Sequence, residues 1–324
     1  MQFTKSSLAG AALAAFAAAL CTLPAPALAC SSCGCTLNAD WGSQGFKSGE
    51  GLSVDLRQDR YHQRQLRSGT GTFNAGAVEL PAEQELQQTT DNRVTTLTLD
   101  YGFASGWGLS LQVPHVARDH TTIAEGDTEV SSSHSSGIGD VRVVARYQGF
   151  SEARDWGLQL GLKFATGATD VNFSRGPQAG GALDAGLQPG TGSTDLLLGA
   201  YRFGNLSGRI DHFSHASVQV PLNSKNGFKP GVGLNFSTGL RYASDGPVVP
   251  QVQLNARIEG RESGENADIP NSGATLVYLS PGATWALGEK LSAYGFVQVP
   301  MYQRVNGLQL EPKLSVSVGL RYGF

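Results

Sequence analysis

The chain has 324 residues, of which 42 are glycine, and its 24 Lys and Arg against 27 Asp and Glu leave a net charge of −3. Glycine is about twice as frequent as in an average soluble domain, and the charged fraction of 16% is below the usual ~25%. This composition argues against a helical bundle. The small negative charge provides no basic surface for phosphate, which argues against nucleic acid as a partner.

The first 29 residues have the pattern of a secretory signal peptide. A basic residue precedes an apolar run over 8–23, and Ala27-Leu28-Ala29 offers an A-x-A cleavage site before Cys30. No later apolar stretch reaches the ~18 residues of a membrane-spanning helix. The sequence therefore predicts three parts: 1–29, a signal peptide; 30–50, a cysteine-containing periplasmic segment or plug; and 51–324, a barrel built from strands.

From Gly51 onward, apolar and polar residues alternate in runs separated by Gly, Asn, Asp or Ser. A period of two is that of a strand with one face toward lipid and the other toward water. In the last run, for example, Val316 and Val318 share one face and Ser315 and Ser317 the other. The pattern predicts twelve strands, at 51–62, 92–103, 106–117, 137–148, 155–166, 193–203, 206–221, 230–243, 248–261, 274–286, 290–302 and 313–324.

The expected connections alternate between short and long. Tight turns such as Ala104-Ser105, Gly204-Asn205 and Gly288-Glu289 leave every second strand, whereas segments such as 63–91 and 166–192 leave the others. Strands this long match the ~9–11 tilted residues that cross hydrocarbon, and the alternation is typical of outer-membrane barrels with both termini in the periplasm. Because unpaired backbone groups are costly in lipid, the sheet has to close. The sequence predicts an all-β, twelve-stranded antiparallel transmembrane β-barrel in the outer membrane of a Gram-negative cell.

Three short motifs carry a resemblance to known barrels. The ending Arg321-Tyr322-Gly323-Phe324 resembles the carboxy-terminal signal of bacterial outer-membrane barrels, which implies that the assembly machinery reads Phe324. Gly137-Ile138-Gly139-Asp140 and Gly192-Ser193-Thr194-Asp195-Leu196 each open a predicted strand and are similar to motifs of the outer-membrane transporter family named for the MetA pathway of phenol degradation. The resemblance covers roughly residues 51–324, and the cysteine-rich start departs from it. It implies a porin-like channel for small solutes, hydrophobic or aromatic ones among them.

The side chains predicted to face the lumen carry both signs of charge. A Lys or Arg facing lipid at mid-bilayer would cost roughly 2–4 kcal/mol, so the apolar face is assigned to lipid. This turns twelve charged residues inward: Asp55, Arg57, Asp100, Arg142, Arg146, Lys163, Arg209, Asp211, Arg241, Arg257, Glu259 and Arg321. The alternation leaves the direction of Arg202 open. The charges indicate either a mildly cationic pore that favours anionic or polar solutes, or arginine–carboxylate ladders that fill a narrow barrel.

Three cysteines lie close together in Cys30-Ser31-Ser32-Cys33-Gly34-Cys35. In an oxidising compartment two of these thiols form a disulfide, and the third cysteine is left unpaired. The alternatives are thiolate binding of Cu(I) or Zn(II) and lipidation of Cys30. Haem attachment fails because Gly34 stands where His is required, and no cofactor is expected. The following segment, with Trp41 and Phe46, is too irregular for a strand, and we expect it to plug the barrel mouth.

Two other functions compete with transport. A docking barrel for a periplasmic redox or metal partner would use Cys30, Cys33 and Cys35 as its contact. A barrel-borne serine hydrolase would pair a His and a Ser two residues apart on one strand face, but no third residue to orient the His is identifiable. The candidate pairs are His212 with Ser214 and His215 with Ser217.

The remaining histidine, aromatic and glycine residues are expected to have structural rather than functional roles. Single histidines are expected to be solvated: His62, His115, His120 and His134. Aromatic residues near strand ends are expected to form girdles at the membrane interfaces: Tyr61, Tyr101, Trp107, Tyr147, Trp156, Tyr242, Trp285 and Tyr322. Strand glycines are expected to leave space on the lumen side: Gly108, Gly157, Gly161, Gly233 and Gly319. The sequence thus predicts a non-enzymatic channel or transporter whose partners are outer-membrane lipid, lipopolysaccharide, the barrel assembly machinery and a small-molecule solute.

Overall fold

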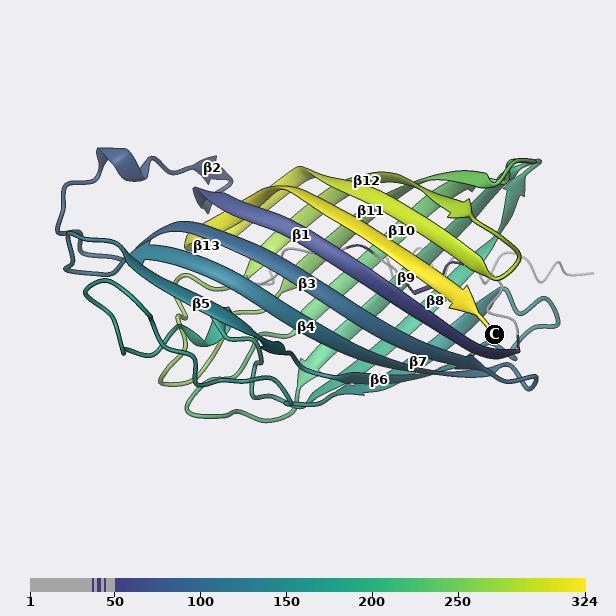
Figure 1. The fold of residues 1–324 in the computed structure, drawn as a ribbon, viewed down its shortest axis with the longest axis horizontal. Helices are drawn as coiled ribbons and strands as arrows, with labels where there is room; N and C mark the ends of the chain where they lie inside the picture. Colours follow the sequence, from purple (N-terminus) through teal and green to yellow (C-terminus); the bar gives the residue numbers. More distant parts are fainter. Residues whose placement is uncertain (1–36, 38–39, 42–43, 45–49) are drawn as a thin grey trace, which may run out of the picture.

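The computed structural model describes residues 37, 40, 41, 44 and 50–324 (Figure 1). The predicted signal peptide and Cys30, Cys33 and Cys35 lie outside these residues. Within the described part, no helix is long and apolar enough to cross a membrane. The elements are β1 (Gly51–Gly69), β2 (Gly71–Thr72), η1 (Ala75–Ala77), β3 (Leu86–Gly102), β4 (Trp107–Ile123), β5 (Ser131–Ile138), β6 (Arg142–Tyr147), β7 (Trp156–Lys163), η2 (Ala185–Leu187), β8 (Asp195–Ser207), β9 (Ile210–Pro221), β10 (Gly233–Tyr242), β11 (Val248–Glu259), β12 (Ala274–Ala286) and β13 (Leu291–Gly323).

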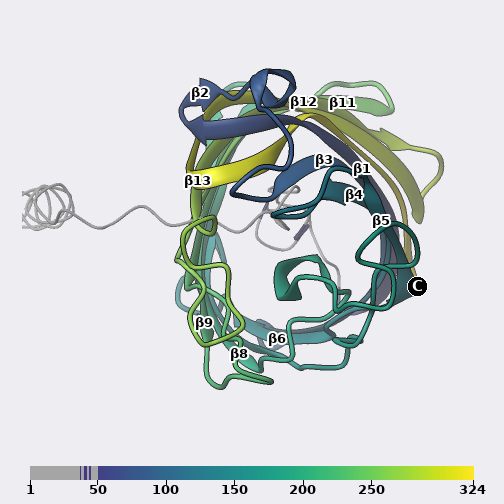
Figure 2. The same ribbon diagram turned by 90° about the vertical axis from the view of Figure 1, so that its left-hand side faces the viewer.

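Eleven of the described strands form one closed antiparallel barrel (Figures 1 and 2). They pair in the order β13-β12-β11-β10-β9-β8-β7-β6-β4-β3-β1, and β13 closes the ring by pairing with β1. β2 pairs with β1, and β5 pairs with β4 off this path. Closure leaves the ring without an open edge, which is what a sheet surrounded by lipid requires.

The predicted strand 137–148 is wrong as a single element. β5 pairs with β4 over His115–Thr122, and β6 pairs with β4 over Trp107–Gln112. Between them the chain leaves the sheet at residues 139–141. Asp140 causes this break, because its carboxylate accepts backbone N–H groups from Gly167 and Thr191 at 3.1 and 3.0 Å.

β13 changes partner along its length of 33 residues. It pairs antiparallel with β12 over residues 292–305 and antiparallel with β1 over 305–323. An odd ring of alternately directed strands cannot close antiparallel unless one strand reverses, and β13 does so at Gly307, whose φ is +54°. The two halves then lie side by side. The Gly323 N–H donates to the Lys290 carbonyl, and Gln303 Nε2 donates to the Pro312 carbonyl, each at 2.9 Å.

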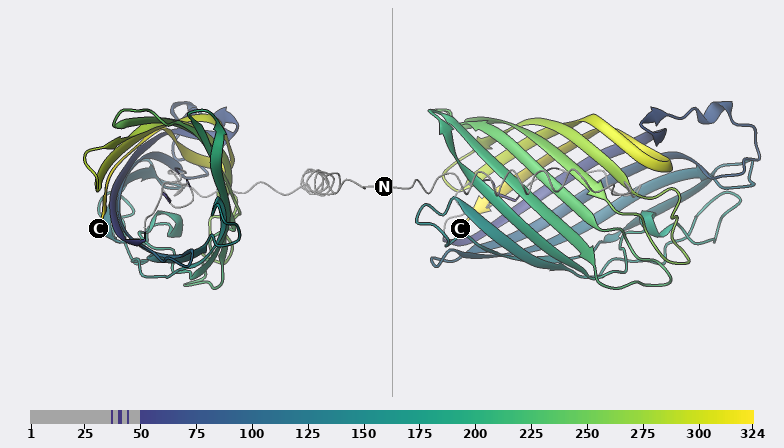
Figure 3. Two further views of the ribbon diagram at one scale, coloured as in Figure 1. Left: turned by 90° about the vertical axis from the view of Figure 1, so that its right-hand side faces the viewer. Right: turned by 180° about the vertical axis from the view of Figure 1, so that it is seen from behind.

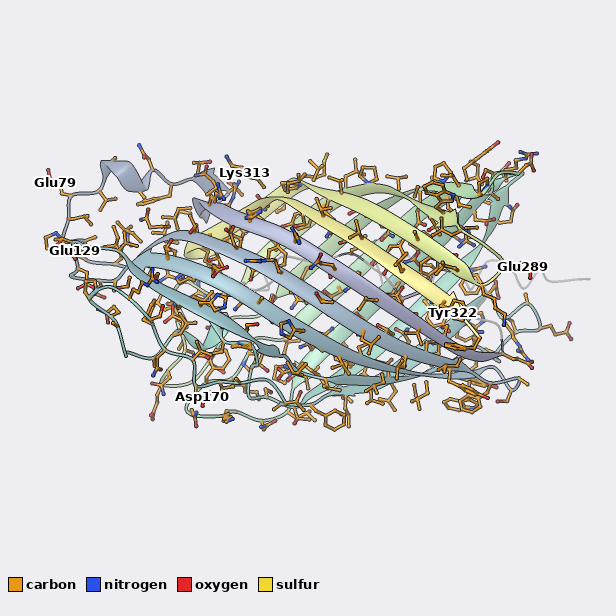
Figure 4. The ribbon with its side chains drawn as sticks, in the orientation of Figure 1. Glu79, Glu129, Asp170, Glu289, Lys313 and Tyr322 are labelled. Carbon is orange, nitrogen blue, oxygen red and sulfur yellow. The ribbon has the colours of Figure 1, made fainter. Side chains whose placement is uncertain are left out.

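The connections are short at the end of the barrel that holds the C-terminus and long at the other end (Figure 3). Figure 4 shows Glu79, Glu129 and Asp170 at the long-loop end and Glu289 and Tyr322 at the short-turn end. The connections at the C-terminal end are 103–106, 148–155, 208–209, 243–247 and 287–290, and those at the other end are 70–85, 124–130, 164–194, 222–232 and 260–273. Connections 148–155 and 124–130 are similar in length, so the contrast between the two ends comes from the others. The predicted turn at 204–205 is wrong, because β8 continues until Gly208 reverses the chain with a φ of +51°.

The two faces of the wall have opposite character. Large apolar side chains lie outside, where Leu56, Leu158 and Val318 are 49%, 47% and 49% exposed, while inward Asp59 and Gln253 are 1% and 0% exposed. A soluble protein has the reverse arrangement, and a lipid-facing barrel requires this one.

Aromatic side chains gather on the outside near the short turns. The Trp107 and Tyr147 rings lie 4.8 Å apart, and Phe150 stacks on Trp156 at 4.4 Å. This placement agrees with an interfacial girdle. Tyr61 is a correction to the predicted girdle, because it points inward and is only 4% exposed.

Candidate functional site: the barrel lumen

The centre of the barrel encloses a cavity of about 280 Å³. Inward side chains from ten of the eleven ring strands line it, together with Leu37, Asp40 and Trp41 from the segment before the barrel. Seven of the charged residues predicted to face the lumen are in this lining: Asp55, Arg57, Asp100, Arg142, Arg146, Arg257 and Arg321.

Three guanidinium groups of the cavity wall, those of Arg57, Arg146 and Arg257, contact neighbouring carboxylates. Arg146 binds both carboxylate oxygens of Asp100, with Nη2 2.8 Å from Oδ1. Arg57 Nε lies 2.8 Å from Asp59 Oδ2. The Arg146–Asp100 pair joins two strands as an arginine–carboxylate ladder does, whereas Arg57 and Asp59 lie on one strand; in both pairs a carboxylate balances the guanidinium charge.

The same pairing continues toward the short-turn and long-loop ends. Arg241 Nε lies 3.1 Å from Asp211 Oδ2, and Arg257 Nε lies 2.8 Å from Glu259 Oε2. Arg257 also donates to Asn235 Oδ1 at 2.9 Å. Each of these two ion pairs therefore ties inward-facing side chains of the wall together.

Lys163 joins the two glycine–aspartate motifs. Its Nζ lies 2.8 Å from Asp195 Oδ2 and 3.1 Å from Asp140 Oδ2, and all three side chains are at most 7% exposed. The Thr191 hydroxyl donates to the same Asp140 oxygen at 2.8 Å. Sequence analysis finds both motifs and places Lys163 inside, but residues far apart along the chain carry no signal that they share one ion-pair network.

The prediction that Arg209 lines the lumen is wrong. Arg209 lies in the turn between β8 and β9, and its Nη1 lies 2.6 Å from Asp245 Oδ2, with both side chains more than half exposed. The reason is the shifted turn, which places the residue at the rim. Arg202, whose direction the sequence leaves open, points outward and is 4.0 Å from Asp155.

An apolar contact fixes the described residues of the amino-terminal segment inside the barrel. Leu37, Trp41, Tyr294 and Phe296 form one buried cluster. The rings of Trp41 and Tyr294 meet edge to face with centroids 5.2 Å apart. The guanidinium carbon of Arg321 lies 5.2 Å from the centroid of the Trp41 ring, which is a cation–π contact.

Polar contacts hold the same segment to other strands. The Gln44 carbonyl accepts from Arg241 Nη1 at 2.9 Å, and Gln44 Oε1 accepts from Gln251 Nε2 at 3.0 Å. Asp40 Oδ2 accepts from Gln159 Nε2. The segment therefore contacts β7, β10, β11 and β13, while Phe46, also assigned to the plug, lies outside the described residues.

Glycines on the inner face make room for large side chains. A Cβ added to Gly319 would lie 2.3 Å from Tyr294 Cζ, and one added to Gly108 would lie 2.6 Å from Arg146 Cζ. A Cβ added to Gly157 would lie 2.5 Å from the Tyr201 hydroxyl oxygen. These three glycines therefore lie beneath large side chains that fill the lumen, and they do not widen it.

The two His-x-Ser pairs face opposite sides of the wall. Ser214 is the register partner of outward Arg202, and its hydroxyl lies 2.9 Å from Thr238 Oγ1. His215 lines the cavity, and its Nε2 lies 2.8 Å from Gln159 Oε1. These hydrogen bonds engage Ser214 and His215 with other partners, so the geometry gives no support to a hydrolase.

The prediction that His120 is solvated is wrong. It is 1% exposed on the inner face of β4, and its Nδ1 lies 2.8 Å from Thr90 Oγ1. The sequence places His120 beyond a predicted strand that ends at 117, whereas β4 continues to Ile123. Local alternation does not show where a strand ends, so the burial of His120 is missed. In the part of the chain that the structure describes, no group of three or more His, Cys, Asp or Glu residues could hold a metal ion.

A closed antiparallel ring with an apolar outer face, an ion-paired polar interior and alternating short and long connections is the fold of an outer-membrane β-barrel channel. Among solved structures, the chain is similar to the COG4313 outer membrane channel from Pseudomonas putida F1, with a TM-score of 0.64 and 14% identity over 89% of this chain and 99% of that one. This likeness shows a shared fold.

Two further solved barrels match less well. The toluene transporter TbuX of Ralstonia pickettii has a TM-score of 0.44 and 10% identity over 85% of this chain and 90% of its own. The CymD monoaromatic hydrocarbon channel has a TM-score of 0.44 and 9% identity over 92% and 98%. No protein-family model and no curated protein matches the chain, so the family indicated by the glycine–aspartate motifs stays a prediction.

Proposed function

We propose that the protein is an outer-membrane channel for small solutes whose lumen is plugged by residues 30–50. The observation that carries the proposal is the position of Trp41 inside a closed ring, packed on Tyr294 and covered by Arg321. A side chain inside the lumen obstructs passage, so solute flow requires this segment to move.

The proposal includes the remaining features of the export route. Residues 1–29 are removed as a signal peptide, and Phe324 serves as the assembly signal. The wall has twelve spans, because the two halves of β13 run in opposite directions and count separately. Both termini are periplasmic, which agrees with the short turns at the end of the barrel that holds Phe324.

The size and lining of the cavity suggest the class of solute. A volume of about 280 Å³ suits a molecule of roughly one ring or a short acid. Hydrophobic or aromatic solutes would replace Trp41 against Tyr294 and Phe296. The paired arginines and aspartates would contact polar groups of the same solute.

Planar-bilayer conductance tests the proposal. Deletion of residues 30–48 is expected to raise single-channel conductance, and Trp41→Ala is expected to raise it by less. Trp107→Ala is the matched control, because that indole is 52% exposed on the outer face and conductance should not change. If the deletion leaves conductance unchanged, the plug is wrong. Uptake of aromatic and of anionic solutes by cells with and without the protein tests the solute class separately.

A further inference from the structure

The outer faces of β1, β3 and β4 change character along their length. Toward the short turns they carry apolar side chains, such as Leu56 and Leu97, which are 49% and 39% exposed. Past these residues the same face becomes charged. Its outward side chains are Arg60, His62 and Arg64 on β1, Asp91 and Arg93 on β3, His115 and Asp119 on β4, and His134 on β5.

The position of this charged face follows from strand geometry. Arg93 lies ten residues along the chain from Phe103 at the short-turn end, where the outward aromatic side chains cluster. At about 3.3 Å per residue and a tilt of about 40°, these positions are about 25 Å apart along the barrel axis. That distance equals the usual height of the lipid-facing band, so Arg93 is level with the headgroups of the opposite leaflet.

Two of the arginines are placed against each other. Arg60 and Arg93 are direct register partners on the same face of β1 and β3. Like charges directly opposite each other destabilise a sheet unless something compensates them. Arg93 Nη2 has a carboxylate partner, Asp119 Oδ2, at 3.0 Å.

Arg60 and Arg64 add charge that no carboxylate matches. Arg60 Nη2 donates to the neutral Gln58 Oε1 at 3.4 Å, and among the described residues neither Arg60 nor Arg64 has an acidic partner within salt-bridge distance. The acids of this face are already engaged, since Asp91 contacts His62 and Asp119 contacts His134 as well as Arg93. Three arginines against two aspartates leave the face cationic at the headgroup level.

We infer that Arg60 and Arg93, with Arg64 further along β1, bind a phosphate group of the outer-leaflet glycolipid, lipid A. A phosphate placed between two guanidinium groups relieves their repulsion and accepts charge-assisted hydrogen bonds from both. The acyl chains of the same molecule would lie along Leu56 and Leu97, which are register partners four residues nearer the short turns than Arg60 and Arg93. The inference rests on the proposed orientation of the channel, which puts the long-loop end in the outer leaflet.

The test compares lipid binding by two matched variants of the full mature chain. Arg60→Ala/Arg93→Ala removes the proposed site, and Arg202→Ala removes an outward arginine near the other end of the barrel. Native mass spectrometry in detergent with EDTA, which excludes bridging by divalent cations, would count bound diphosphoryl lipid A. Heat-modifiable migration on gels would show that each variant is folded.

We expect the double variant to bind lipid A about tenfold more weakly, and Arg202→Ala to bind as the wild type does. Arg60→Lys/Arg93→Lys should recover part of the loss. Equal binding by the double variant and the wild type would overturn the site. Competition by inorganic phosphate alone at the same concentration would show a free-anion site instead.

Two further outcomes separate this inference from the channel proposal. Loss of lipid A binding in Arg202→Ala alone would place the lipid A site at the short-turn end, which overturns the inference. Unchanged conductance in the double variant is expected, because the site is outside the lumen. The plug proposal and the lipid-site proposal can therefore be overturned independently of each other.

Discussion

Lys163 and Asp195 form a 2.8 Å ion pair inside the barrel wall, with side-chain exposures of 3% and 0%. Asp140 shares the same ammonium group at 3.1 Å. The three residues come from β7, the start of β8 and the break between β5 and β6. One lysine thus ties together the part of the wall where the 164–194 connection leaves and rejoins the sheet.

Removing this lysine should be costly. Lys163→Met leaves two buried carboxylates without their cation, and breaking a buried pair in this way typically costs about 3–5 kcal/mol. Arg209→Ala, which breaks the exposed Arg209–Asp245 pair, should change stability by less than about 1 kcal/mol. Denaturant unfolding in detergent micelles, followed by tryptophan fluorescence, measures both. Equal losses in the two variants would contradict the assigned role of Lys163.

Adding a methyl group beneath a lumen aromatic should also destabilise the barrel. Gly319→Ala places a Cβ 2.3 Å from Tyr294 Cζ, and such overpacking costs about 1–3 kcal/mol. Gly323→Ala is the control, because a Cβ there meets nothing within 4 Å. The same unfolding measurement applies, and Tyr294→Leu in the Gly319→Ala background should recover part of the loss. No recovery would mean that the backbone, not the ring, is the obstacle.

The loop end should loosen as the pH rises. Burial raises the pKa of Glu85 to about 7 from its ordinary 4.5, and repulsion from Asp184 adds to the shift. The folded protein therefore binds more protons than the unfolded chain between these values, so stability falls as pH rises through this window. Thr122 Oγ1, which donates to Glu85 Oε1 at 2.6 Å, fixes the carboxyl group in place.

Limited proteolysis of the 70–85 connection measures this effect. Cleavage should be faster above pH 7 than below pH 5 in the wild type. Glu85→Gln should be cleaved at a rate that follows only the protease's own pH profile. A wild-type profile identical to that of the Gln variant would rule out Glu85 as the titrating group.

Phe324 should matter to assembly more than to stability. Its side chain is 67% exposed, and its ring contacts Tyr322 at 4.9 Å. Phe324→Ala is therefore expected to lower the amount of folded barrel in cells while leaving refolding in detergent unchanged. Heat-modifiable migration on gels measures the folded fraction in cells and after refolding. Equal amounts of folded wild type and Phe324→Ala in cells would show that Phe324 is not an assembly signal.

Local alternation predicts most of the wall, because the side-chain period of a strand reports directly which face meets lipid. It identifies the inward charges on the spans and the inward glycines. It fails where partners beyond the strand decide the structure. The β5–β6 break depends on Asp140 reaching Gly167 and Thr191, and the extent of β1 to Gly69 depends on pairing with β13.

The candidate site shows the same division. The inward direction of Arg146 follows from its strand, but its partner Asp100 comes from β3, two strands away in the ring. Burial of His120 depends on Thr90 and on the inward loop near η2. Contacts of this kind need the register between distant strands, which no single run of residues contains.

The seam between β1 and β13 sets the order of events during folding. Ser53 pairs with Gly323, so the ring closes only when the first and last parts of the described wall meet. Hairpins such as β8–β9 join neighbours and can form early, whereas closing the seam carries the loop entropy of nearly the whole chain. Until β13 pairs with β1, the sheet has two exposed edges, and a chain that lacks β13 would keep unpaired edges that can join other chains.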